Sequence, residues 1–211
     1  EFPAVFEAFR TAGIRKLILD MRYNGGGDVT VAQNLASYLY ANPSTPEIFG
    51  KLLHNNKHQS LNRTYHFKSE LNRLNLDQVI VIASSATCSA SEMIINGLRP
   101  FVDVKIVGST TCGKPVGMNG FSFCDNILLP LTFEIRNQND QGEYFDGITA
   151  DCAANDDVTF EFGDNQEPML SEALYLSANN QCQTQAKAKV APKEVTGPFH
   201  GISLRAVIGA Y

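Results

Sequence analysis

Two apolar runs, each followed by a turn and then a helical pattern, constrain the fold of this chain more than any other feature. Residues 15–21 contain the continuous run LIL, which is typical of a buried strand, and the glycine-rich turn of residues 24–28 follows. Residues 29–41 place apolar side chains on one face, as a helix does. Residues 79–84 (VIVIAS) and 90–99 (ASEMIINGLR) repeat this order of strand and helix. Two such βα units predict a sheet with parallel strands.

The other apolar segments extend this pattern in two different ways. Residues 3–13 predict a helix, and residues 104–109 predict a third buried strand. Between residues 119 and 162, short apolar runs alternate with polar and turn residues, which is typical of antiparallel strands. Residues 167–177 predict a last helix with proline near its start. The chain is therefore predicted to form an α/β domain of mixed sheet with flanking helices, and with antiparallel strands in its second half.

Composition agrees with a packed domain and argues against some functions. Of the 211 residues, 44% are hydrophobic and 18% are charged, so there is enough apolar material for a core. The net charge of −5 argues against a nucleic-acid partner. No apolar run in the sequence approaches the roughly 20 residues of a membrane span. Because the first residue is Glu1 and a helical pattern begins at once, we expect a piece of a longer protein.

Five cysteines allow disulfide bonds without determining their pairing. Cys112 and Cys124 bracket a glycine-rich stretch, and Cys152 and Cys182 flank an acidic segment and a helix. These four are expected to form two disulfides, with Cys112 paired to Cys124; four cysteines allow three connectivities, and reduced thiols remain an alternative. Cys88 is then left over as a small core residue. Disulfides would imply an oxidising location such as the periplasm or the cell surface.

Neither a metal ion nor a cofactor is expected. Histidines at metal-ligand spacing occur at His54 and His58, within the polar sequence HNNKH, which is a weak signal for a zinc site. The glycine turn of residues 24–28 lacks the Gly-Lys-Ser/Thr continuation of a phosphate-binding loop. We therefore look for chemistry in the side chains and backbone groups of the chain itself.

Three consecutive glycines after the first predicted strand can form an oxyanion-binding turn. Glycine tolerates positive φ and allows another backbone or a ligand to approach closely. Backbone N–H groups of Gly25, Gly26 and Gly27 could then point at a negative oxygen. A tight turn without a functional role is the alternative for this motif taken alone.

Ser89 lies between a predicted strand and a predicted helix. With Glu92 three residues later, it forms a capping-box pattern, which by itself marks no more than the start of a helix. A nucleophile here would gain from the helix N-terminus, because the helix dipole favours developing negative charge. Cys88 is a weaker candidate nucleophile, since it follows an apolar strand and has no identified histidine partner.

Lys114 follows the third predicted strand and would ordinarily be a solvated charge. If it is buried beside Ser89, desolvation lowers its pKa and makes the neutral amine a usable base. Moving a lysine pKa from about 10.4 to about 7 costs roughly 4–5 kcal/mol, which is tolerated mainly where function requires it.

Several segments, in this order, resemble the tail-specific or C-terminal processing family of serine peptidases. Residues 16–27 (KLILDMRYNGGG) resemble its strand and glycine turn, and Thr87–Glu92 resembles its nucleophile segment. Ser109–Lys114 (STTCGK) resembles its lysine segment, and Asp146–Asp151 resembles its GIxPD signature. Residues 163–174 are similar to the segment that commonly closes the domain.

The resemblance implies a ClpP/crotonase-like core and a peptidase mechanism. Ser89 would attack a peptide carbonyl to form an acyl-enzyme, and Lys114, at the family's usual spacing of 25 positions, would accept its proton. Backbone N–H groups of the Gly25–Gly27 turn and of Ala90 would form the oxyanion hole. The implied partners are protein or peptide substrates, and the implied role is the processing or degradation of cell-envelope proteins in the periplasm or outside the cell.

The resemblance also implies a division of the chain. It covers about residues 1–176, which we assign to the catalytic core, and the polar segment of about 42–76 is an insertion with a hairpin or short helix of its own. Residues 177–211 then form a C-terminal extension packed on or near the core. No PDZ-like domain is present in this sequence, so either a substrate-recognition domain lies outside it or this member lacks one.

One departure from the family pattern concerns the lysine. Many members carry glutamine four residues after it, where Met118 stands here, and methionine cannot orient an ammonium group by a hydrogen bond. Thr110, Thr111 and Asn119 are candidates for that role. This departure keeps open a second function, that of a catalytically inactive family member acting as a binding module. A crotonase-type acyl-CoA enzyme is a third, which would require acidic catalytic residues in the cleft.

Overall fold

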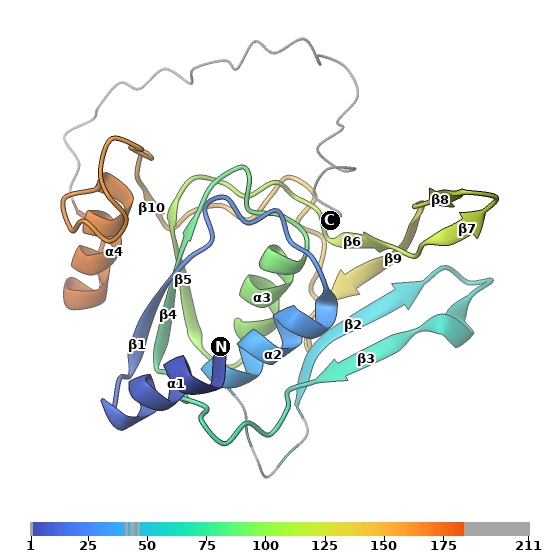
Figure 1. Ribbon diagram of the computed structural model, residues 1–211, viewed down its shortest axis with the longest axis horizontal. Coiled ribbons are helices and arrows are strands. Elements are labelled where there is room, and N and C mark those ends of the chain that lie inside the picture. Colours follow the sequence, from blue (N-terminus) through green and yellow to red (C-terminus); the bar gives the residue numbers. More distant parts are fainter. Residues whose placement is uncertain (1, 41, 43–44, 46, 184–211) are drawn as a thin grey trace.

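The computed structural model describes residues 2–40, 42, 45 and 47–183. Within them, one four-stranded sheet is parallel and a second four-stranded sheet is antiparallel, and helices lie between the two sheets and on the outer face of the first (Figure 1). The predicted α/β fold with a mixed strand arrangement is therefore confirmed. None of the helices in the described part of the chain has both the length and the apolar character that crossing a membrane requires.

The parallel sheet comes from the predicted βα units. Its order is β1 (Lys16–Asp20), β4 (Gln78–Ala83), β5 (Asp103–Gly108) and β10 (Cys152–Ala153). The central strand β4 pairs with both β1 and β5 over its length. Every residue of β4 is buried, and this explains why its sequence is a continuous apolar run rather than an alternating one.

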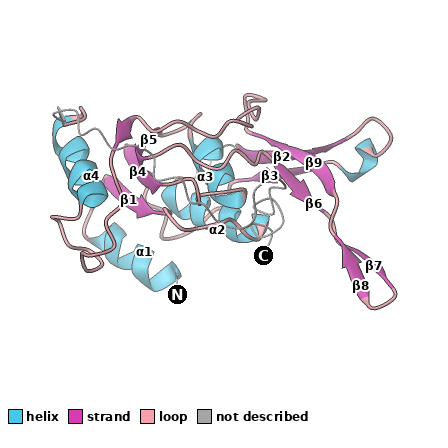
Figure 2. Cartoon of the chain, turned by 90° about the horizontal axis from the view of Figure 1, so that it is seen from above, coloured by secondary structure: helices cyan, strands magenta, loops and turns pink. Residues whose placement is uncertain are grey.

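Helices cover both faces of this sheet (Figure 2). They are α1 (Phe2–Thr11), α2 (Val29–Leu39), α3 (Ala90–Leu98) and α4 (Pro168–Asn179). On one face, Val79 and Val81 of β4 belong to the large core that contains α2 and α3. On the other face, Ile80 and Ile82 pack against α4. The alternation of side chains along one strand therefore divides the interior into two cores.

The antiparallel sheet lies beyond α2 and α3. Its order is β3 (Arg63–His66), β2 (Ile48–His54), β9 (Leu131–Arg136) and β6 (Val116–Met118). The polar segment of about 42–76 contributes β2, β3 and a short 3-10 helix, η1 (Gln59–Leu61), between them. β3 pairs with β2, and β2 pairs with β9, so this segment forms one side of the antiparallel sheet.

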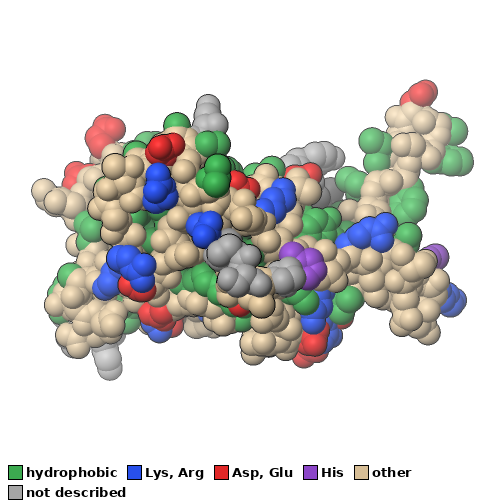
Figure 3. Space-filling model, turned by 90° about the horizontal axis from the view of Figure 1, so that it is seen from below, with side chains coloured by type: hydrophobic (Ala, Val, Ile, Leu, Met, Phe, Trp, Pro, Cys, Tyr) green, Lys and Arg blue, Asp and Glu red, His purple; other side chains and the backbone are tan. Residues whose placement is uncertain are grey.

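A separate hairpin follows β6 and projects from the molecule. It consists of β7 (Phe121–Phe123) and β8 (Asn126–Leu128). Figure 3 shows hydrophobic side chains on this projection, and Phe123, Ile127 and Leu128 are 63–76% exposed. Cys124 lies in its turn and is exposed.

The prediction of antiparallel strands through residue 162 was wrong for its second half. Antiparallel pairing ends with β9 at Arg136, and β10 runs parallel to β5. Apolar residues after β10, including Val158 and Phe162, are exposed instead of paired. Alternation of apolar and polar residues indicates a strand only where a partner strand is available, and here none is paired with them in the described structure.

Arg22, two residues after the end of β1, is buried and forms an ion cluster that joins β1 to α4. Its guanidinium nitrogens lie 2.7 Å from Asp156, 2.9 Å from Glu167 and 3.0 Å from Asp20. Glu167 is also the N-cap of α4 and accepts the N–H of Leu170 at 2.9 Å. Burial alone would raise the pKa of Glu167, but the hydrogen bonds from Arg22 and from the helix N-terminus lower it below its usual value.

Replacing Glu167 with alanine should therefore lower the free energy of unfolding by about 3 kcal/mol, because Arg22 stays buried with one carboxylate fewer. Unfolding in urea, followed by circular dichroism, measures this loss. The matched control is Asp20→Ala, since Asp20 contacts the same guanidinium but its side chain is 46% exposed. That variant should lose no more than about 1 kcal/mol. Equal losses in the two variants would contradict the importance of burial in this cluster.

Candidate active site

A pocket of about 460 Å³ lies between the N-terminus of α3 and the antiparallel sheet. Ser89, Ala90 and Lys114 line it on one side, next to Gly27 and the start of α2. The opposite wall is mainly apolar and comes from β2, β3, β6, β9 and the segment before β9: Leu52, Tyr65, Met118, Leu129, Phe133 and Ile135. The predicted nucleophile and base, which are far apart in the sequence, therefore share one concave site with an apolar wall.

Ser89 has an unusual backbone conformation. It immediately precedes α3, with φ of 56° and ψ of −116°. A residue other than glycine at positive φ costs on the order of 1–3 kcal/mol, and such residues persist where the surrounding structure determines them, often at active sites. Its side chain is partly exposed and lines the pocket. The sharp turn thus presents the hydroxyl at the end of a helix N-terminus, where negative charge is favoured.

The glycine turn lies directly against the Ser89 segment. A Cβ atom on Gly26, whose φ is 106°, would come within 2.8 Å of both Ser89 Cβ and the Cys88 carbonyl oxygen. Asn24 joins the two segments as well, since its carbonyl oxygen accepts the N–H of Cys88 at 3.1 Å and its Oδ1 accepts the hydroxyl of Ser91 at 2.8 Å. Glycine is required at position 26 because no side chain fits between the two backbones.

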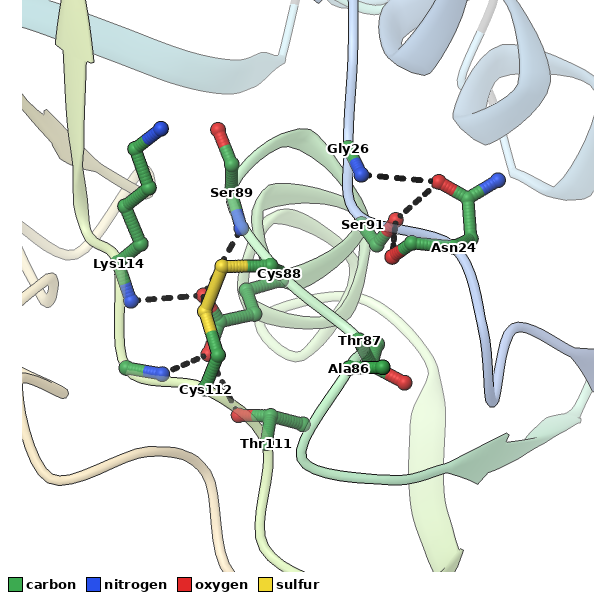
Figure 4. The surroundings of a disulfide bond; sticks show 12 residues. Asn24, Gly26, Ala86, Thr87, Cys88, Ser89, Ser91, Thr111, Cys112 and Lys114 are labelled. Atoms are coloured by element: carbon green, nitrogen blue, oxygen red, sulfur yellow. Dashed lines mark hydrogen bonds between the residues drawn. A yellow bond between two sulfur atoms is a disulfide. The ribbon is translucent and has the colours of Figure 1, made fainter. Parts of the chain in front are cut away.

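Only two of the four predicted oxyanion-hole residues line the pocket. The N–H of Gly26 donates to Asn24 Oδ1 at 3.0 Å, so this group is already used within the turn (Figure 4). Gly27 and Ala90 line the pocket, whereas Gly25 and Gly26 are not among its lining residues. Ala90 is the first residue of α3, so its N–H has no acceptor within the helix. Of the four residues, Gly27 and Ala90 are therefore the ones that lie at the pocket.

Lys114 is 94% buried, although lysine is rarely buried to this extent. Figure 4 shows its side chain extending to the same side as that of Ser89. Burial lowers the pKa of Lys114 from 10.5, and the negative charge of Glu92 offsets part of this effect. The sequence-based expectation that burial would lower the pKa of this amine therefore agrees with the environment of the side chain.

Glu92 connects the Ser89 segment to the Lys114 segment. It is fully buried, and its carboxylate accepts four hydrogen bonds. Oε2 accepts the backbone N–H groups of Ser89 at 2.9 Å and of Lys114 at 2.8 Å. Oε1 accepts the hydroxyl of Thr111 at 2.5 Å and the N–H of Gly113 at 2.8 Å. The sequence identified Glu92 as half of a capping box with Ser89. Its contacts with Thr111, Gly113 and Lys114 depend on the path of the lysine loop, which is the segment 109–115 between β5 and β6.

Of the three predicted lysine-orienting residues, Thr110 and Thr111 lie on the loop before Lys114, and Asn119 lines the same pocket. The Thr111 hydroxyl donates to Glu92 and accepts the N–H of Ile148 at 2.7 Å. Thr110 packs beside Gly147, where a Cβ atom would lie 2.6 Å from its methyl group. Met118 and Asn119 both line the pocket.

Asn119, which lines the pocket, contacts a histidine that the sequence did not connect with this site. Its Nδ2 lies 3.1 Å from Nε2 of His54, the last residue of β2. Pairing of β2 with β9 places His54 opposite Phe133, which also lines the pocket. No local pattern around His54 could have indicated this position, because it results from strand pairing between distant segments.

The cysteine pairing differs from the expectation in one of its two bonds. Cys88 is bonded to Cys112, with Cα atoms 5.2 Å apart, and Cys152 is bonded to Cys182. The prediction of Cys112–Cys124 was wrong, as was the description of Cys88 as an unpaired core residue. The β7–β8 hairpin carries Cys124 away from the lysine loop, whereas that loop passes directly beside Cys88. The expected bond between Cys152 and Cys182 is present.

Two groups of possible metal ligands occur in the described residues, and each includes a disulfide. One contains Cys88, Glu92 and Cys112, and the other contains Cys152, Glu172 and Cys182. A metal ion binds the thiolate form of cysteine, which a disulfide-bonded sulfur cannot provide. These groups therefore do not serve as metal sites in the oxidised chain.

Comparison with known proteins identifies peptidases as relatives of this chain. The model of "Peptidase family S41" matches residues 1–154. A probable CtpA-like serine protease of Staphylococcus aureus is 25% identical over 93% of this chain and 44% of its own length. A putative S41 protease of Bacteroides fragilis has a similar structure, with a TM-score of 0.79, 28% identity, and coverage of 85% of this chain and 49% of that one. The photosystem II D1 C-terminal processing protease shares the fold, with a TM-score of 0.58, 19% identity, and coverage of 72% and 38%.

The chain thus spans less than half the length of the relatives to which it is compared.

Proposed function

The chain belongs to peptidase family S41, a family of serine peptidases, and from this premise we propose that it hydrolyses peptide bonds with Ser89 as nucleophile and Lys114 as general base. One observation carries this proposal: a buried lysine of lowered pKa lines the same pocket as a serine at positive φ on a helix N-terminus. The combination is costly for stability and matches what a serine–lysine mechanism needs.

The proposed reaction follows from these positions. The neutral amine of Lys114 removes the proton from Ser89 Oγ as that oxygen attacks the carbonyl carbon of the substrate. Backbone N–H groups of Ala90 and Gly27 donate to the resulting oxyanion, which the N-terminus of α3 also stabilises. The Lys114 ammonium then gives its proton to the leaving amine, and an acyl-enzyme on Ser89 remains. Water, deprotonated by Lys114, hydrolyses the ester and restores the hydroxyl.

The pocket and the disulfides support a substrate class and a location. The apolar wall formed by residues such as Leu52, Phe133 and Ile135 is suited to an apolar side chain of an extended polypeptide. Two disulfides are stable in an oxidising compartment, which supports action in the cell envelope or outside the cell. Processing or degradation of cell-envelope proteins, and substrate recognition by a domain outside these residues, are proposals for the whole protein.

A serine-directed fluorophosphonate probe tests the assignment of the nucleophile. The intact protein should be labelled, and mass spectrometry should locate the adduct on Ser89. Ser89→Ala should abolish labelling, whereas the control Ser85→Ala should not change it, because Ser85 is exposed and is not among the residues that line the pocket. A folded protein that resists the probe would instead favour a catalytically inactive binding module. Met118, which lines the pocket where many family members carry glutamine, is the observation that favours this second function.

A further inference from the structure

We propose that the Cys88–Cys112 disulfide positions Ser89 and Lys114 for catalysis, so that a dithiol reductant inactivates the enzyme without unfolding it. This inference rests on the proposed function and assigns to the bond a role in the reaction itself. Cys88 and Cys112 are thus positioning residues, since neither is proposed to touch the substrate.

The bond joins the two segments that carry the reacting groups. Cys88 directly precedes Ser89, and Cys112 stands two residues before Lys114. Figure 4 shows the bond beside both side chains, between the turn before α3 and the loop between β5 and β6. Any movement of one segment relative to the other would change the separation of Ser89 Oγ and Lys114 Nζ. The disulfide restricts that movement, because it links the two segments covalently.

The backbone conformation of Ser89 is a second reason to expect that the disulfide positions the nucleophile. Its positive φ is retained only if its neighbours restrain it. Cys88 is restrained through its backbone by the N–H bond to the Asn24 carbonyl, and through its side chain by the disulfide. Cleavage of the S–S bond removes the second restraint from the residue next to the strained position.

Reduction would also disturb Glu92. The sulfurs of Cys88 and Cys112 and a carboxylate oxygen of Glu92 all lie within 4.8 Å of one another. A disulfide has no proton to donate, but two thiols would bring two S–H donors to the carboxylate that now accepts the N–H groups of Ser89 and Lys114. The new donors would compete for the same oxygens and displace the two segments.

The fold should survive reduction, because other bonds cross the same junction. The N–H of Cys112 donates to the Thr87 carbonyl at 3.0 Å, and β4 and β5 pair along six positions. Glu92, on α3, also accepts the Thr111 hydroxyl and the Gly113 N–H of the neighbouring loop. Loss of precise positioning without loss of the fold is therefore the expected consequence.

The redox step is an ordinary exchange with a dithiol. A thiolate of the reductant attacks Cys112, the partly exposed partner, and the S–S bond to the buried Cys88 breaks. The second thiol of the reductant then displaces Cys112. Two electrons and two protons pass to the chain, which gains two thiols, and the reductant becomes a disulfide.

The test uses three forms of the full chain, all carrying Cys124→Ser to remove the exposed thiol. They are this parent, the double variant Cys88→Ala/Cys112→Ala, and the matched control Cys152→Ala/Cys182→Ala, which lacks the disulfide at α4. Hydrolysis of a short peptide is measured for kcat, KM and pH profile, before and after treatment with dithiothreitol, and circular dichroism follows the fold.

The Cys88/Cys112 variant should lose about 10- to 100-fold in kcat, with an altered pH profile and no further loss on reduction. The parent and the control should lose activity by a similar factor when dithiothreitol is added, with their circular dichroism unchanged. Should the Cys88/Cys112 variant fail to fold, reduction of the parent measures the same effect. A parent that keeps its kcat and pH profile with Cys88 and Cys112 fully reduced, or loses activity only as it unfolds, would overturn the proposal.

Failure of the proposed function would look different. In that case the oxidised parent would neither hydrolyse the peptide nor be labelled at Ser89 by the fluorophosphonate probe, and the role of the disulfide would fall with it. A parent that is labelled and active but insensitive to reduction would refute the role of the disulfide alone.

Discussion

Replacing Lys114 with methionine should lower kcat/KM for peptide hydrolysis by about 10⁴-fold or more. Methionine has a similar length and is apolar, so it can occupy the buried site without the cost of burying an ammonium group. The thermal midpoint of the variant should therefore be equal to or above that of the parent. Activity and calorimetry of the same preparation measure the two effects, and a variant that is folded and fully active would contradict the assignment of Lys114 as the base.

The pH dependence of the parent gives a second measurement of the same residue. The protonated amine cannot accept the proton of Ser89, so activity should be low in acid and rise through the pKa of Lys114. Because burial lowers that pKa from 10.5, the rise should occur at lower pH than an exposed lysine would give. Lys114→Arg, which stays protonated, should remain inactive at every pH. A flat profile from about pH 6 to about pH 9 in an assay limited by chemistry would contradict this role.

Replacing Glu92 with glutamine should have the next largest effect, on stability and activity together. Each carboxylate oxygen accepts two hydrogen bonds, from the Ser89 and Lys114 N–H groups and from Thr111 and Gly113. A glutamine has one acceptor oxygen, so in either orientation its NH₂ group faces two donors. Two unsatisfied buried donors should cost about 3 kcal/mol or more of unfolding free energy. Displacement of the two segments should lower kcat by about 100-fold.

The same substitution should change the pH profile in a defined direction. The negative charge of Glu92 raises the pKa of Lys114, and glutamine removes that charge. The rise of the remaining activity should therefore shift to lower pH. Glu172→Gln is the matched control, because Glu172 is equally buried but lies on α4 and accepts the N–H of Gln183. An unchanged profile in Glu92→Gln, or an equal loss of kcat in Glu172→Gln, would contradict the role of Glu92.

The two βα units could be predicted because their signals are local. The run LIL of β1, the continuous apolar β4 and the amphipathic α2 each occupy a short stretch, and the periodicity of each reflects its own burial. The strands of the second half were less predictable. The alternation after Arg136 resembles that of β9, but a strand also needs a partner, and partners are set by the course of the whole chain.

The candidate site was predictable to the extent that residue types in a fixed order carry it. The order of glycine turn, Ser89 and Lys114 led to the family and to the pair of residues that the structure places in one pocket. The engagement of the Gly26 N–H by Asn24 could not be read from the glycines, because it depends on the local path of the turn. The position of His54 beside Asn119 depends in the same way on the pairing of β2 with β9.

The sequence by itself determined the fold class, the family and the two candidate catalytic residues, since these depend on short patterns and on their order. The tertiary structure alone decided what holds those two residues together. The disulfide joins Cys88 to Cys112 rather than Cys112 to Cys124, and Glu92 accepts hydrogen bonds from both segments. Spacing along the chain does not report either fact, because the distance between side chains is set by how the sheets and loops pack in three dimensions.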